Sequence, residues 1–189
     1  RLLYYRRAGI GQYTLRLLEA LTQAAPQERF LLLLDRRQAG RPLQAPNLRP
    51  VPVYTPSHHR WEAFTLPVEL LPLGLDLLHS PDFVLPPRRS YAGVATVHDL
   101  AFLRHPELVT RQAVRYYGRV RQAVAGAERV IAVSECTKRD LLELLQVPEE
   151  KVTVVYEAAG ALFRPLGLAP EERRLFHDRR LGPQQFALF

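Results

Sequence analysis

His98 and Asp99 are the residues whose types and positions are best suited to chemistry. They follow directly after the apolar run Val94-Ala95-Thr96-Val97, and His79 ends the run that starts at Leu75. Buried parallel strands carry functional side chains at their carboxyl ends, facing the ligand crevice of an open sheet. An imidazole there can hydrogen-bond a ligand hydroxyl or accept a proton. We therefore take His98 and Asp99 as candidate catalytic residues and His79 as a candidate binding residue. A purely structural, hydrogen-bonded histidine is the alternative.

Two predicted helix starts are candidate anion sites. Gly9-Ile10-Gly11 stands before one helical pattern, and Ser134 stands before another. Glycines let a backbone approach a ligand closely, and free amides together with the helix dipole favour an anion. We take Gly9, Ile10, Gly11 and Ser134 as candidate substrate- or phosphate-binding residues. The alternatives are a tight turn at the glycines and simple helix capping by Ser134.

The sequence predicts neither a metal site nor a cofactor. No spacing of His, Asp, Glu and Cys matches a zinc site, and no phosphate-binding P-loop is present. Cys136 is the single cysteine, so an intramolecular disulfide and a cysteine cluster are both excluded. No serine stands beside His98 to suggest a hydrolase triad.

The elements that must position these residues alternate between strands and helices. Such alternation predicts an α/β fold in which crossover helices cover a parallel sheet. Apolar patterns predict strands at 30–34, 48–54, 75–79, 92–98, 129–133 and 152–156, and helices at 10–24, 61–71 with an interruption at Pro67, 111–125, and from Ser134 to 145.

Size and charge limit the class of protein. The 189 residues, 47% of them hydrophobic, suffice for one domain with a buried core. The net charge of +7 comes from arginines that are scattered and interleaved with acids, so we expect no nucleic acid as partner. An arginine-rich surface still favours anionic ligands. No apolar run reaches the roughly 20 residues that span a bilayer, and we expect a soluble, cytoplasmic protein.

With these residues in view, the chain resembles the amino-terminal domain of the retaining group 1 (family 4) glycosyltransferases, which have the GT-B architecture. The similarity is to their mannosyltransferase-like members and runs from Tyr4 to about Pro165. The motifs that carry it occur in the family's order: GIGQYT at 9–14, WE at 61–62 with LP at 66–67, HSP at 79–81, TVHDL at 96–100 with RHPE at 104–107, and VSECTKRDL at 133–141 with VPEEKV at 147–152.

The resemblance implies a Rossmann-like parallel sheet with helices on both faces over residues 1–165. It implies that 166–189 form a linker helix and the first strand of a carboxyl-terminal domain missing from this chain. A nucleotide-sugar donor would bind mainly to that missing domain, and a saccharide or lipid-linked acceptor would bind here. The reaction implied is metal-free transfer of a hexose, mannose among the candidates, with retention. We expect this chain to be inactive alone.

The resemblance also implies roles for individual residues. The amides of the glycine-rich segment, which includes Tyr13, would lie near the donor phosphates or the acceptor hydroxyl. His98 would contact the transferred sugar, and Asp99 would support its loop. Two features depart from the family pattern, since no paired-glutamate motif is found and Gly160 stands where an aspartate is common.

Other readings remain open from the sequence. The chain can be a non-catalytic Rossmann-like binding module, or a basic nucleic-acid-binding domain that heparin would retain. The helix at 61–71 can also carry an apolar stripe beside His58, His59 and Arg60 that contacts the inner face of a membrane peripherally. The stripe residues expected are Trp61, Phe64, Leu66 and Leu70, and a helix that faces the core is the alternative.

Overall fold

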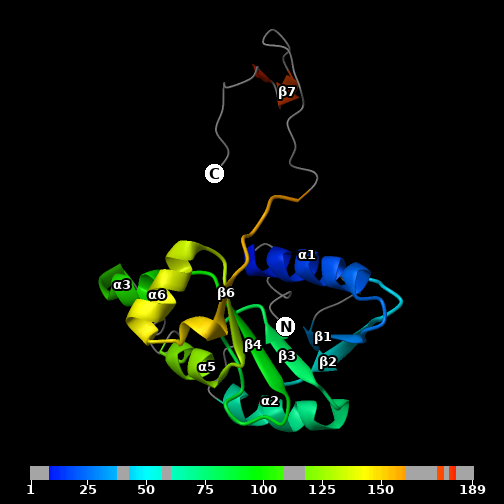
Figure 1. The fold of residues 1–189 in the computed structure, drawn as a ribbon. Helices are drawn as coiled ribbons and strands as arrows, with labels where there is room; N and C mark the ends of the chain where they lie inside the picture. The colour runs from blue at the N-terminus through cyan, green and yellow to red at the C-terminus, as the bar shows by residue number, and fades with distance from the viewer. Residues whose placement is uncertain are drawn as a thin grey trace. The chain divides into compact units, whose positions relative to one another are not determined.

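A computed structural model describes residues 9–37, 43–56, 61–108, 118–160, 174–176 and 179–181. The chain divides into two compact units, Arg1–Glu157 and Ala158–Phe189. Among the described residues, the first unit holds six strands, all in parallel pairs, and the helices that flank them (Figure 1). This arrangement confirms the α/β fold predicted from the alternation of strands and helices.

The strands of the first unit form two parallel sheets. The pair β1-β2 makes one sheet, and the other has the order β3-β4-β5-β6. The strands are β1 (Phe30–Asp35), β2 (Leu48–Val53), β3 (Leu77–Ser80), β4 (Ala92–Val97), β5 (Arg129–Ala132) and β6 (Val152–Val154). The helices are α1 (Gly9–Ala24), α2 (Glu62–Leu70), α3 (Ala101–Arg104), α5 (Val120–Gly126) and α6 (Glu135–Leu145), with the 3-10 turns η2 (Leu71–Leu73), η3 (Pro106–Leu108) and η4 (Glu149–Lys151).

Helices cover both faces of the strands. Helix α1 lies on one side and α2 on the other (Figure 1). Leu15 and Leu18 of α1 pack against Leu32 and Leu34 of β1. On the opposite side, Leu66 and Leu70 of α2 join Val53 and Tyr91 in a second buried cluster. The Rossmann-like layering that the resemblance implied is therefore present.

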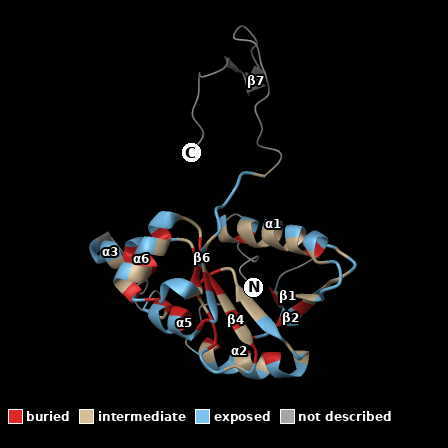
Figure 2. Ribbon diagram, in the orientation of Figure 1, coloured by how far each residue is buried: buried red, intermediate tan, exposed pale blue. Residues whose placement is uncertain are grey.

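The largest core cluster lies between β4, β5 and the helices α5 and α6. Figure 2 shows that buried residues run along β4. All of its members are buried. Those that are at most 1% exposed include Ala95, Val97, Val120, Val124, Val130, Ala132 and Leu141. This core fixes the carboxyl ends of β4 and β5, from which two of the candidate segments emerge.

Strand β2 accommodates two prolines because their nitrogens face away from β1. In β2, Pro50 and Pro52 alternate with residues that face β1, because the Phe30 amide donates to the Asn47 carbonyl and the Arg36 amide to that of Val53. The proline nitrogens thus point to the open edge, where a missing donor costs nothing.

The predicted interruption of the second helix is wrong, since α2 runs through Pro67. Of the helix predicted at 111–125, residues 118–125 are described, and α5 begins at Val120.

A space remains between the two sheets. No strand of the described residues lies between β1 and β3, and an open pocket of about 900 Å³ lies along their facing sides. Leu31 and Leu33 of β1 and Leu77 and Leu78 of β3 contribute apolar side chains to its wall. Among the described residues, the β1-β2 pair therefore contacts the rest of the fold through the helices and this apolar boundary.

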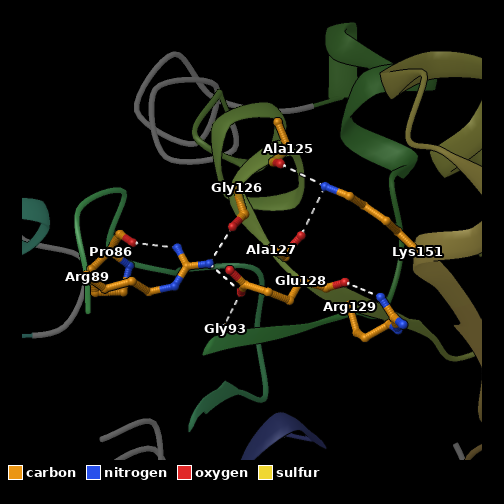
Figure 3. A network of polar contacts seen from close by, with 9 residues as sticks. All are labelled: Pro86, Arg89, Gly93, Ala125, Gly126, Ala127, Glu128, Arg129 and Lys151. Atoms are coloured by element: carbon orange, nitrogen blue, oxygen red, sulfur yellow. Dashed lines mark hydrogen bonds and ion pairs between the residues drawn. The ribbon is translucent and has the colours of Figure 1, made fainter. Parts of the chain in front are cut away.

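A buried arginine ties together the opposite, amino-terminal ends of the strands (Figure 3). The Arg89 side chain is only 6% exposed and pairs with the Glu128 carboxylate, with Arg89 Nη2 2.7 Å from Glu128 Oε2. The guanidinium also donates to the carbonyls of Pro86 and Gly126, and Glu128 accepts from the Gly93 amide. These contacts join the loop before β4, the end of α5 and the start of β5.

In the second unit, the described residues are 158–160 and the strands β7 (Arg174–Phe176) and β8 (Arg179–Leu181), which pair antiparallel. We expected a linker helix and a strand in 166–189; the described residues of this segment form this strand pair, and the linker helix stays a prediction. The expected strand at 186–189 lies outside the described residues. The boundary at 165 stays a prediction.

Candidate functional site

Polar groups from four strand ends and one helix meet at the carboxyl edge of the larger sheet. His79 lies within β3, while His98 follows β4, Ser134 follows β5 and Glu157 follows β6. Tyr13, on the first turns of α1, reaches the same edge through its contacts with Thr96 and His98. The two histidines thus lie at this edge of the sheet together with Tyr13, Ser134 and Glu157.

The hydroxyl of Thr96 links two of the predicted binding residues. Thr96 is fully buried, and its Oγ1 lies 2.9 Å from His79 Nε2 and 3.3 Å from the Tyr13 hydroxyl. Burial lowers the pKa of His79 below its ordinary value of 6.5, because a desolvated imidazole resists taking up charge. His79 is therefore a neutral hydrogen-bonding group that holds the carboxyl end of β3 against β4 and α1.

The imidazole of His98 is held on three sides. Its Nε2 donates to the Pro81 carbonyl at 2.9 Å, and its Nδ1 lies 3.1 Å from Glu157 Oε1. The Tyr13 ring packs against it edge to face, with 5.1 Å between ring centroids and an interplanar angle of 89°. His98 thus joins the segments after β3 and β6 to α1, and its ring has one orientation.

Ser134 caps helix α6 and also supports His98. The Ser134 hydroxyl accepts from the Thr137 amide at 3.1 Å, and the Thr137 hydroxyl donates to the His98 carbonyl at 3.0 Å. The two hydroxyls lie 3.0 Å apart, so Ser134 can donate to Thr137. This geometry shows Ser134 in the capping role, which was the alternative to phosphate binding. Phosphate binding by Ser134 stays a prediction.

The glycine segment is helical. Gly9 and Gly11 lie in the first turn of α1, with Gly11 buried and Gly9 exposed. A Cβ built on Gly9 would meet no atom within 4 Å, so open space adjoins this end of the helix. The first amides of a helix have no intrahelical acceptor, and anion binding by Gly9, Ile10 and Gly11 stays a prediction.

Asp99 acts on its own turn. Its Oδ1 accepts from the Ala101 amide at 3.0 Å at the start of α3, and the residue is exposed. This contact fits the supporting role expected for the loop. The structure shows no contact that brings Asp99 to the His98 ring, and a catalytic role for either residue stays a prediction.

Three residues of this edge were not predicted. Thr96 and Thr137 are buried hydroxyls that hold His79, Tyr13 and the His98 backbone. Glu157 pairs with His98, although the two are far apart in sequence. A threonine inside an otherwise apolar strand was a signal for Thr96, whereas nothing in the sequence near Glu157 indicated its partner.

The apolar stripe expected on the second helix has different members. Leu66 and Leu70 are buried, at 3% and 1% exposure, so those two predictions are wrong. The exposed apolar residues at helical spacing are Trp61, Phe64, Val68 and Leu71. The basic residues at 58–60 lie outside the described residues.

None of the described helices is long and apolar enough to cross a membrane. Within the same residues, no group of three or more His, Cys, Asp or Glu side chains is arranged to hold a metal ion.

The sequence matches the model of a known protein family. The family model described as Glycosyltransferase Family 4 matches residues 7–158, which include every candidate site residue and all six parallel strands. No curated protein matches the chain. The match confirms the family that the sequence motifs resembled.

Proposed function

The chain belongs to glycosyltransferase family 4, and from that membership we propose that it is the acceptor-binding part of a glycosyltransferase. The proposed reaction moves a hexose, mannose among the candidates, from a nucleotide-sugar to a saccharide or glycolipid acceptor with retention at the anomeric carbon. The observation that carries the proposal is the convergence of Tyr13, His98 and the first turn of α1 at the carboxyl edge of the sheet.

The polar groups at this edge suit a substrate that combines hydroxyls with phosphate. The first amides of α1 offer donors and a positive dipole end to an anion. Near them, the Tyr13 hydroxyl and the Glu157 carboxylate are groups that can exchange hydrogen bonds with hydroxyls, and His98 and His79 hold the segments that carry them. A nucleotide-sugar facing a saccharide has both kinds of group, whereas a nucleic acid would require a concentrated basic surface.

In the proposed mechanism the protein supplies position and electrostatics. The acceptor oxygen bonds to the anomeric carbon on the face from which the diphosphate departs, and the diphosphate takes the acceptor's proton. No protein nucleophile is required. Fixed hydrogen-bond donors act where charge develops in such a step. His98, with its ring held from three sides, is proposed to contact the transferred sugar, and Gly9 to Gly11 to lie near the phosphates.

The proposal also covers where the donor binds and where the protein works. The nucleotide-sugar is proposed to bind mostly to a second domain that this chain does not include, and this chain alone to be inactive. We propose that the protein works in the cytoplasm with peripheral contact at the inner face of the membrane. The membrane contact is supported by the exposed apolar residues Trp61, Phe64, Val68 and Leu71 on one side of α2.

A transfer assay tests the proposed function. The polypeptide encoded by the complete reading frame and the 189-residue chain would each be incubated with nucleotide-hexoses and saccharide or glycolipid acceptors. We expect product, with retained anomeric configuration by NMR, only from the former. His98→Ala in that protein should lower kcat/KM by about a hundredfold. Absence of transfer by the complete protein would instead support a non-catalytic Rossmann-like binding module.

A further inference from the structure

The ring nitrogens of His98 are both engaged by protein groups. Nε2 donates to the Pro81 carbonyl, and Nδ1 faces Glu157 Oε1. Both ring nitrogens carry a hydrogen only when the imidazole is protonated. In the protonated form, the contact between His98 Nδ1 and Glu157 Oε1 is an ion pair. In this arrangement the imidazole presents neither nitrogen to a ligand. The polar group that it holds toward the outside is the carboxylate of Glu157.

We infer that Glu157 is the residue that binds the acceptor hydroxyl, with His98 as the positioning residue that orients its carboxylate. The inference rests on the proposed function and assigns one residue to the acceptor side of the reaction. It gives the segment after β6 a role in recognition.

Exposure supports the assignment. The Glu157 side chain is 47% exposed, whereas that of His98 is 20% exposed. A carboxylate has two oxygens with about four lone-pair directions, and the contact with Nδ1 uses Oε1. The group thus retains capacity to accept hydrogen bonds from one or two hydroxyls. Hydrogen bonds to an ionised acceptor are shorter and stronger than neutral ones.

The negative charge of the Glu157 carboxylate favours a hydroxyl over a phosphate as its ligand. A carboxylate repels an anion, so the neighbourhood of Glu157 is unfavourable for the diphosphate of a donor. The first turn of α1, which favours an anion, meets the same edge through Tyr13. The edge is therefore divided into an anion side at α1 and a hydroxyl side at Glu157, as a reaction between a sugar phosphate and a hydroxyl requires.

Ligand titrations of the 189-residue chain test the inference. The probes are methyl α-mannoside and methyl α-glucoside for hydroxyls, and inorganic phosphate for anions, followed by amide shifts in ¹H–¹⁵N spectra. We expect Glu157→Ala to weaken glycoside binding by about tenfold or more and to leave phosphate binding equal or tighter. Glu157→Gln, which keeps an acceptor oxygen without the charge, should lie between. Retained amide dispersion in each variant checks the fold.

Glu143→Ala is the matched control. Glu143 lies in the carboxyl-terminal half of α6, is similarly exposed at 52%, and pairs with Arg104. Its loss should therefore leave the affinities for glycoside and phosphate unchanged. Equal glycoside affinity in wild type and Glu157→Ala overturns the inference while leaving the proposed function intact. Wild-type chain that binds no glycoside overturns the acceptor-side assignment of the proposed function and the inference with it.

Discussion

At the scale of single residues, the buried hydroxyl of Thr96 organises the edge of the sheet. Its one oxygen lies within hydrogen-bond distance of both His79 and Tyr13, which come from β3 and α1. A buried polar group without a partner costs about 1–3 kcal/mol, so each of these side chains depends on the other two. The neutral state of His79 is part of this arrangement.

The lowered pKa of His79 predicts how stability depends on pH. Burial lowers it below 6.5, so the unfolded chain binds a proton at a pH where the folded chain does not. Stability from this residue is complete above about pH 6.5 and falls as the pH drops toward the folded-state value. His79→Asn should therefore flatten the decrease in melting temperature between about pH 7.5 and about pH 5.5.

Thermal unfolding monitored by circular dichroism at the two pH values measures this effect. His105→Asn is the control, because the His105 side chain is 60% exposed and should leave the slope as in the wild type. An unchanged slope in His79→Asn would show that other groups cause the acid sensitivity.

At the scale of elements, the sequence predicted the strands and helices better than their partners. Apolar runs indicated β1, β4 and β5 because burial on both faces leaves a continuous hydrophobic signal. The faces of α2 were misassigned because Leu66 and Val68 have similar hydrophobicity, and only the position of the sheet decides which one is covered. The His98–Glu157 pair depends on β4 and β6 being separated by one strand, which no local pattern encodes.

The network around Arg89 gives a prediction about the joints between elements. A Cβ on Gly93 would lie 2.7 Å from the Arg89 guanidinium, whereas one on Gly126 would lie at an ordinary 3.8 Å from it. Gly93→Ala should displace the guanidinium from Glu128 and lower the free energy of unfolding by about 1–3 kcal/mol.

Gly126→Ala is the matched control and should change stability little, since the added methyl group meets no close atom. Urea denaturation of both variants decides the point. Equal loss in the two variants would mean that the clash is absorbed by a small movement of the long side chain.

At the scale of the whole molecule, the first unit is a sheet in two parts with unequal support. The β3-β4-β5-β6 part is built around the largest buried cluster, while β1 and β2 pair only with each other among the described strands. Two-stranded sheets are marginally stable by themselves, and the clusters that pack α1 and α2 against β1 and β2 are smaller than the one around β4 and β5. Local opening should therefore begin in β1 and β2.

Hydrogen exchange measures this difference. Peptides that cover 30–35 and 48–53 should exchange at least about tenfold faster than peptides that cover 92–97 and 129–132. Uniform protection across all four segments would indicate that the two sheets open as one cooperative unit.

Trp61, at the start of α2, has a consequence for spectroscopy. It is the sole tryptophan of the chain and is already 51% exposed, with its ring 6.3 Å from that of Phe64. Its fluorescence in the folded protein should resemble that of a solvated indole and should change little when the β4–β5 core, which does not include Trp61, melts. An unfolding curve recorded by this fluorophore follows α2, so its disagreement with circular dichroism would mimic a folding intermediate.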